Sequence, residues 1–167
     1  MRELTTLKVG GCPQLTETGI RRIVKTFPYL EVIDISGCHQ LHNTAIIALL
    51  SSYRSLRSLK ASHLPAVDDG AFDYERPMEG LTAYTITHLH LDCCAISDRT
   101  LDALSCSALS IEHLSVRWCS KLTLQGVQRF LMSAPCIQSI DISDLGFPTD
   151  AFSFFAGRVV NPCWLDS

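Results

Sequence analysis

The sequence predicts an α/β solenoid, a right-handed stack of about six repeats that each contain one strand and one helix. The first observation is a sequence motif of the form apolar-x-x-apolar-x-apolar-x-x-Cys/Leu, whose copies begin at Leu4, Leu30, Leu56, Ile86, Ile111 and Ile137. The second is the spacing of these copies, 26, 26, 30, 25 and 26 residues, because such a period is typical of stacked-repeat proteins. The third is a further set of apolar residues that follows each motif at helical spacing.

The composition agrees with one folded domain. The chain has 167 residues, of which 47% are hydrophobic and 19% charged, so it can bury a core and is too apolar for disorder. A formal net charge of −3 gives no basic excess, which argues against nucleic acid as a partner. The longest aliphatic run covers only residues 45–50, and the first residues lack the order of a signal peptide. We therefore expect no membrane contact and an intracellular, cytoplasmic protein.

Residues 87–92 show the alternation of a strand with one buried face. Leu89 and Leu91 are expected to point inward, whereas His88, His90 and Asp92 point outward. The other copies keep this register, so six strands can pair in parallel into one sheet. Their inward pairs are Leu7/Val9, Ile33/Ile35, Leu59/Ala61, Leu114/Val116 and Ile140/Ile142.

Capping residues precede the expected helices. Thr16, Asp68, Ser97 and Thr123 can each accept hydrogen bonds from the free amides that open a helix. Apolar residues at helical spacing follow most of these caps, and this pattern places the helices on the side opposite the open face of the sheet. The helical apolar sets are Ile20/Ile23/Val24, Ile46/Leu49/Leu50, Leu101/Leu104, Val127/Phe130/Leu131 and Phe152/Phe155.

The third repeat is longer than the others, with four extra residues between Phe72 and Ile86. Its segment 73–80 is polar and contains a proline and a glycine, so we expect a loop that bulges from the helical side. The loop is either a tolerated insertion or a second contact site, since added loop length costs little free energy.

The cysteines follow the repeat. Four of the eight occupy one repeat position, where Leu64 and Leu145 stand in two other copies. A position that accepts Cys or Leu favours a small apolar filler, so we expect buried, reduced thiols. Zinc is the alternative, but the chain has no Cys-x-x-Cys and places the repeated cysteines one per repeat.

Two copies carry a motif that resembles the cysteine-containing class of leucine-rich repeat, known best from the F-box/leucine-rich-repeat proteins. The motifs are Leu30-x-x-Ile33-x-Ile35-x-x-Cys38-x-x-Leu41 and Ile111-x-x-Leu114-x-Val116-x-x-Cys119-x-x-Leu122-Thr123-x-x-Gly126-Val127. The resemblance covers roughly residues 4–155 and implies a short horseshoe arc with a concave parallel sheet and convex helices. Those proteins are the substrate-choosing subunits of cullin-type ubiquitin ligases, and similar repeats serve in ciliary, mitochondrial and plant hormone-receptor assemblies, so fold alone does not fix function.

We assign residues 1–156 to the leucine-rich repeat domain and residues 157–167 to a C-terminal capping tail rich in apolar residues. No F-box motif stands before Leu4, so we expect the usual route of ligase docking to be absent. The first repeat is expected to leave Leu7 and Val9 at an open apolar edge, which solenoids normally cover.

The outward residues of the strands form three rows on the concave side of the expected arc, which we call the sheet face. Neighbouring strands lie about 4.8 Å apart, so charged neighbours such as Lys8 and Asp34 can pair. The rows give a mixed polar surface that suits a protein partner, although it can also be a solvated face with no ligand. The candidate partner-binding residues are Lys8, Asp34, Lys60, His88, His90, Asp92, His113, Ser115, Arg117, Trp118 and Asp141.

The same residues could in principle form a metal site or a catalytic site. His88, His90 and His113 with Asp92 have the donor types of a metal site, but a flat sheet spreads them, so we assign no metal and no cofactor. Trp118 is either a contact residue at the rim or packs over its neighbours in the stack. No nucleophile, phosphate or metalloprotease motif is present, and a Cys93/His63 pair follows from the repeat itself, so we predict no catalytic residues and no enzyme.

The leading hypothesis is a non-enzymatic protein-interaction module, similar to a ligase substrate receptor or an adaptor scaffold, that binds its partner on the sheet face within a hetero-complex. The alternative is a structural subunit of a larger assembly, such as a ciliary, axonemal or mitochondrial complex. That subunit would be held through its open amino-terminal edge and the loop of the third repeat.

Overall fold

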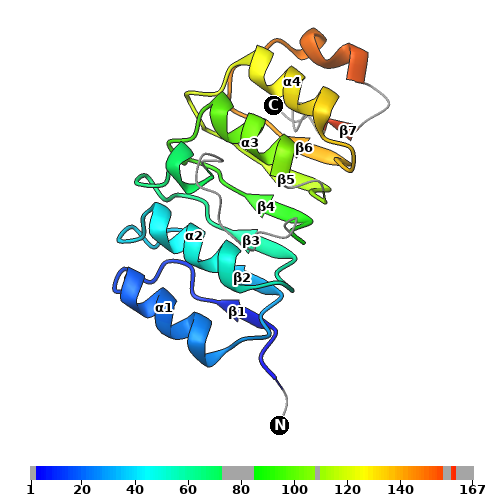
Figure 1. Ribbon diagram of the computed structural model, residues 1–167. Coiled ribbons are helices and arrows are strands. Elements are labelled where there is room, and N and C mark those ends of the chain that lie inside the picture. Colours follow the sequence, from blue (N-terminus) through cyan, green and yellow to red (C-terminus); the bar gives the residue numbers. More distant parts are fainter. Residues whose placement is uncertain (1–2, 73–84, 108–109, 156–158, 161–167) are drawn as a thin grey trace.

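The computed structural model describes residues 3–72, 85–107, 110–155 and 159–160. One parallel sheet runs the length of the molecule, with its strands in sequence order (Figure 1). The strands are β1 (Thr6–Lys8), β2 (Val32–Asp34), β3 (Ser58–Lys60), β4 (His88–His90), β5 (His113–Ser115), β6 (Ser139–Asp141) and β7 (Val159–Val160). The fold is therefore the α/β solenoid that the repeat spacing predicts, and it agrees with the leucine-rich repeat arc that the resemblance implies.

The register of the sheet agrees with the predicted rows. Leu7, Ile33, Leu59 and Leu89 are successive partners at the centres of β1 to β4, and β5 and β6 continue the series. Period-two alternation fixes this register, because a shift by one residue would turn every apolar side chain outward.

Four α-helices pack along one side of the sheet, α1 (Glu17–Thr26), α2 (Asn43–Ser52), α3 (Asp98–Ser107) and α4 (Leu124–Ser133) (Figure 1). The third and sixth repeats differ from the prediction, since they carry the 3₁₀-helices η1 (Asp69–Ala71) and η2 (Thr149–Phe155). After the cap of the third repeat, only Ala71 and Phe72 offer apolar surface before the sequence becomes polar. Two apolar residues are too few to hold a longer helix against the core.

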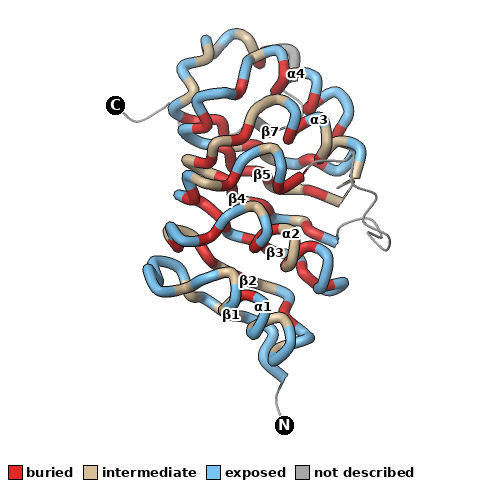
Figure 2. The backbone as a smooth tube through the Cα atoms, turned by 60° about the vertical axis from the view of Figure 1, so that its left-hand side comes forward, coloured by how far each residue is buried: buried red, intermediate tan, exposed pale blue. Residues whose placement is uncertain are grey.

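The core lies between the sheet and the helices, as the band of buried backbone in Figure 2 shows. The fully buried side chains include Ile33 and Leu59 from the sheet and Ile20, Leu49 and Phe130 from the helices. At the first repeat Leu7 and Val9 are only half-buried, and Leu4 is 41% exposed.

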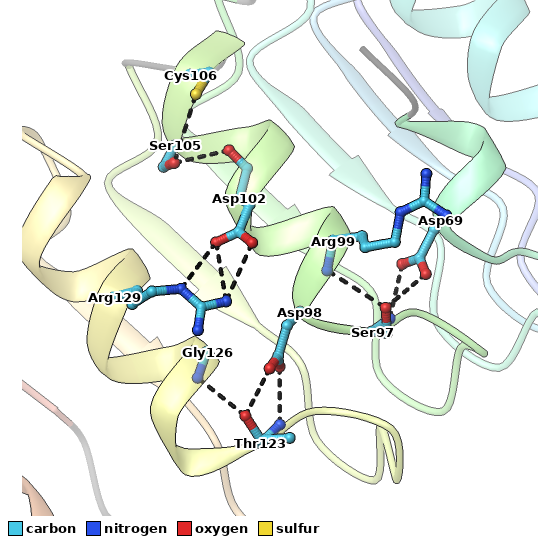
Figure 3. A network of polar contacts seen from close by, with 10 residues as sticks. All are labelled: Asp69, Ser97, Asp98, Arg99, Asp102, Ser105, Cys106, Thr123, Gly126 and Arg129. Carbon is cyan, nitrogen blue, oxygen red and sulfur yellow. Dashed lines mark hydrogen bonds and ion pairs between the residues drawn. The ribbon is translucent and has the colours of Figure 1, made fainter. Parts of the chain in front are cut away.

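Polar side chains at the helix starts join each repeat to the next (Figure 3). Asp98, the first residue of α3, accepts hydrogen bonds from the backbone nitrogen and the hydroxyl of Thr123, at 2.9 and 2.6 Å. Thr123 in turn caps α4 by accepting from the Gly126 nitrogen. Asp69 of η1 accepts from the nitrogen and hydroxyl of Ser97 in the same way, at 2.8 and 2.6 Å.

The same link joins the earlier repeats. Asn43 Oδ1 accepts from the Asp68 nitrogen at 3.0 Å, and Glu17 accepts from the His42 nitrogen at 2.8 Å. The residue before η2 is Pro148, which has no N–H to donate, so the last repeat does not receive this bond.

Two predicted segments fall mostly outside the described residues. The loop at 73–80 lies entirely outside them, and of the tail at 157–167 only Val159–Val160 are described, as a strand that pairs with β6. Within the described ranges, no helix combines the length and apolar character that a membrane crossing requires.

Candidate protein-binding face

The strand registers align the outward residues of the repeats into the three expected rows. The first row is Thr6, Val32, Ser58, His88, His113 and Ser139; the second is Lys8, Asp34, Lys60, His90, Ser115 and Asp141. The third row follows the strands, where backbone bonds continue from repeat to repeat, and contains Gly10, Ser36, Ser62, Asp92, Arg117 and Ser143. Together they make up the sheet face, which none of the described helices covers (Figure 1).

Asp92 is the centre of a hydrogen-bond network on the sheet face. Its carboxylate accepts from the hydroxyls of Ser62 and Ser115, at 3.2 and 2.5 Å, and from the Arg117 nitrogen at 2.9 Å. Ser115 is only 7% exposed, so it offers a partner little surface and acts by fixing Asp92. A carboxylate held by donors from the repeats on either side of it is fixed in position.

The histidines occupy the middle of the sheet face. The rings of His88 and His113 lie with centroids 4.4 Å apart, and His113 Nδ1 is 2.6 Å from the Ser139 hydroxyl. Burial and the neighbouring His113 lower the pKa of His88, while burial and the nearby Lys60 lower the pKa of His90. These two imidazoles are therefore neutral at neutral pH and offer hydrogen bonds rather than charge.

The metal alternative gains no support from this arrangement. Across residues 3–72, 85–107, 110–155 and 159–160, no group of three or more His, Cys, Asp or Glu side chains is placed to hold a metal ion.

The charged residues of the sheet face differ in how they are paired. No ion pair joins Lys8 to Asp34 among the described residues; instead the Asp34 carboxylate accepts from the Ser36 nitrogen at 3.0 Å. Arg117 is the cation that is held, by Asp144 at 2.9 Å and by Asp141 at 4.0 Å. The Asp144 carboxylate raises the pKa of Arg117.

Trp118 stands at the rim of the sheet face, 59% exposed. Its backbone is left-handed, with φ of 59°, and the same repeat position is left-handed elsewhere: Gly11, Gly37, His63, Cys93 and Asp144. We call these six residues the rim column. Asp144 did not appear among the predicted site residues, because it lies one position outside the three rows; its alignment with Trp118 in the repeat was the available signal.

The repeated cysteines are buried behind this rim. The thiols of Cys38, Cys94 and Cys119 each donate to a carbonyl of the preceding repeat, at 3.1 to 3.2 Å. Burial raises the pKa of Cys94 to about 12 and that of Cys119 to about 11. The seven described cysteines are all free, and Cys12 differs from its repeat equivalents in being exposed. Neutral buried thiols of this kind are structural and poorly reactive.

Comparisons with known proteins point to the same repeat. A family model described as "Leucine Rich repeat" matches residues 85–105. The F-box protein SKIP1 of Arabidopsis thaliana is 22% identical over 140 residues, 83% of this chain and 42% of that protein. The putative F-box/LRR-repeat protein 23 of the same plant is 24% identical over 150 residues, 89% of this chain and 32% of that protein. The chain thus spans less than half the length of these relatives.

Solved structures share the fold. A chain of the yeast Rad7 and Elc1 complex matches 72% of this chain and 29% of its own length, with a TM-score of 0.58 and 24% identity. The tropomodulin C-terminal domain of Caenorhabditis elegans and actin-binding site 2 of leiomodin-1 each match 93% of this chain, and 82% and 80% of their own. Their TM-scores are 0.53 and 0.52, at 12% identity, so the likeness is one of fold alone.

Proposed function

We propose that this leucine-rich repeat chain, whose repeats are related to those of F-box/leucine-rich-repeat proteins, is a non-enzymatic module that binds a protein partner through its sheet face. One observation carries the proposal. Lys60, His88 and His90 stand together on β3 and β4, on the face that none of the described helices covers, and Lys60 is exposed without an ion pair to any described residue. An unpaired cation beside two imidazoles on a rigid sheet is suited to recognise a partner.

The finer proposal is that the chain acts within a hetero-complex as a substrate-receptor arm or adaptor scaffold. The curated relatives carry F-box names, and this chain matches 32–42% of their length. This chain consists of repeats, and the resemblance to F-box/leucine-rich-repeat proteins implies that such repeats choose the substrate.

We place this module inside the cell. The support comes from the cysteines, since the described ones are all free, and three of them keep neutral thiols in the core. A reducing compartment preserves such thiols.

The test is quantitative affinity capture from cell extract with the full chain and two matched variants. The sheet-face variant carries Lys60→Ser, His88→Ser and His90→Ser, replacements that rows one and two already contain at other repeats. The control variant removes the same residue types from exposed positions outside the strands, with Lys25→Ser, His39→Ser and His42→Ser. Circular dichroism checks that all three chains fold.

We expect proteins that co-purify with the native chain to remain with the control variant and to fall at least tenfold with the sheet-face variant. Equal recovery with both variants would overturn the proposal. A third variant, Leu7→Glu with Val9→Glu, tests the alternative of a structural subunit, which is favoured by the half-buried state of these two residues. Loss of the partners in this variant alone, with its fold retained, would support that alternative.

A further inference from the structure

The side chain of Trp118 is exposed although its backbone conformation is unfavourable. A left-handed backbone costs about 1–2 kcal/mol for a residue with a side chain, and glycine occupies the same rim-column position in the first two repeats. The ring recovers little of this cost by burial, because the residue is 59% exposed. An aromatic ring held at the surface in this way has the properties of a contact residue.

Three carboxylates lie around Arg117, the residue before Trp118. The preceding residue, Arg117, donates to Asp144 at 2.9 Å, lies 4.0 Å from Asp141, and donates its backbone nitrogen to Asp92 at 2.9 Å. Three carboxylates against one guanidinium leave two negative charges uncompensated in this group. The guanidinium itself is occupied by Asp144 and Asp141, so it offers little to an incoming anion.

We propose that the rim around Trp118, bordered by Asp92, Asp141 and Asp144, binds an arginine or lysine side chain of the partner protein. The inference rests on the proposed function and adds the chemistry of the partner. The face of an indole attracts a cation, and neighbouring carboxylates supply opposite charge and acceptors for its N–H groups. The indole ring and the carboxylates together select a basic side chain better than either does alone.

A substitution of Arg117 tests this arrangement. Arg117 competes with the incoming cation for Asp144 and Asp141, so its removal frees these two carboxylates, while the backbone bond to Asp92 remains. Arg117→Ala is therefore expected to tighten the binding of a basic probe. If the rim instead bound an anion through Arg117, the same change would weaken binding.

The experiment uses the full chain and a fluorescein-labelled hexa-arginine peptide, followed by fluorescence anisotropy in 0.15 M salt. A hexa-citrulline peptide, which has the same shape without the charge, is the control probe. Trp118→Gly removes the ring and suits the left-handed backbone, so it should fold. His63→Gly is the matched control, because His63 is exposed and left-handed in the same column two repeats earlier.

We expect Trp118→Gly to raise the Kd for hexa-arginine at least fivefold, His63→Gly to leave it unchanged, and Arg117→Ala to lower it at least twofold. Equal affinity of the two glycine variants would overturn the inference, as would equal binding of both peptides. This outcome is separable from failure of the proposed function: captured partners that still depend on the sheet face would leave that function standing.

Discussion

The thiol of Cys119 donates to the carbonyl oxygen of Leu91, 3.1 Å away in the preceding repeat, and Cys94 bonds Ala61 in the same way at 3.2 Å. This explains why cysteine recurs at a position that also tolerates leucine. It fills a small apolar space and adds a hydrogen bond to a carbonyl of the preceding repeat. The sequence pattern indicated the filler but not the hydrogen bond.

Alkaline pH should weaken the fold through these residues. Burial raises the pKa of Cys94 from 9.0 to about 12 and that of Cys119 to about 11, so the folded chain keeps protons that the unfolded chain has lost above pH 9. Their contribution is complete below pH 9 and is lost as the pH rises from 9 to about 11 for Cys119 and to about 12 for Cys94. One unit of pH in this window costs about 1.4 kcal/mol per cysteine.

The measurement is the free energy of unfolding in urea at pH 8 and pH 10, for the native chain and for Cys94→Ala with Cys119→Ala. The double variant is less stable at pH 8, because two cavities are opened. Its further loss between pH 8 and pH 10 should be smaller than that of the native chain. Equal losses in the two proteins would contradict the account of the thiols.

At the scale of the elements, the start of each helix is set by the repeat before it. The Asp98 carboxylate reaches over the start of α4 to Thr123, and it occupies the space that a side chain at Gly126 would need (Figure 3). Gly126 is thus required by a close approach and not by an unusual backbone angle.

Gly126→Ala is expected to destabilise the native chain by about 1 kcal/mol. The methyl group displaces Asp98 and breaks two charge-assisted hydrogen bonds, a loss larger than the gain of about 1 kcal/mol in helix propensity. In an Asp98→Ala background the same change should stabilise, since only the propensity gain remains. The check is a double-mutant cycle from urea unfolding, and a destabilising effect of equal size in both backgrounds would refute the contact.

The elements also show what the sequence could and could not predict. Alternation and spacing predicted the centres and partners of β1 to β6, because one buried face leaves only one register, but β7 in the predicted tail was not foreseen. The 3₁₀-helices of the third and sixth repeats were not predicted, because a capping residue such as Asp68 indicates where a helix starts but not how long the helix is. The Arg117 to Asp144 pair was missed because Asp144 lies outside the rows and the long Arg117 side chain reaches it from the preceding repeat.

At the scale of the whole molecule, the stacked repeats present two different surfaces. The helical side is linked from repeat to repeat by caps and by the Arg129 to Asp102 pair at 3.1 Å, which is exposed and contributes little to stability. The sheet face keeps Lys8, Lys60 and the imidazole of His90 outside such pairs among the described residues. Binding through the sheet face is the central claim that follows.

Site-specific photo-crosslinking tests this claim most directly. p-Benzoylphenylalanine is placed at position 58, next to His88 in the first row of the sheet face, or at position 132 on α4, where Met132 is 75% exposed. Each chain is irradiated with the partner obtained by affinity capture. The account predicts a covalent adduct from position 58 and none from position 132. An adduct from position 132 alone would contradict it and would move the binding surface to the helical side.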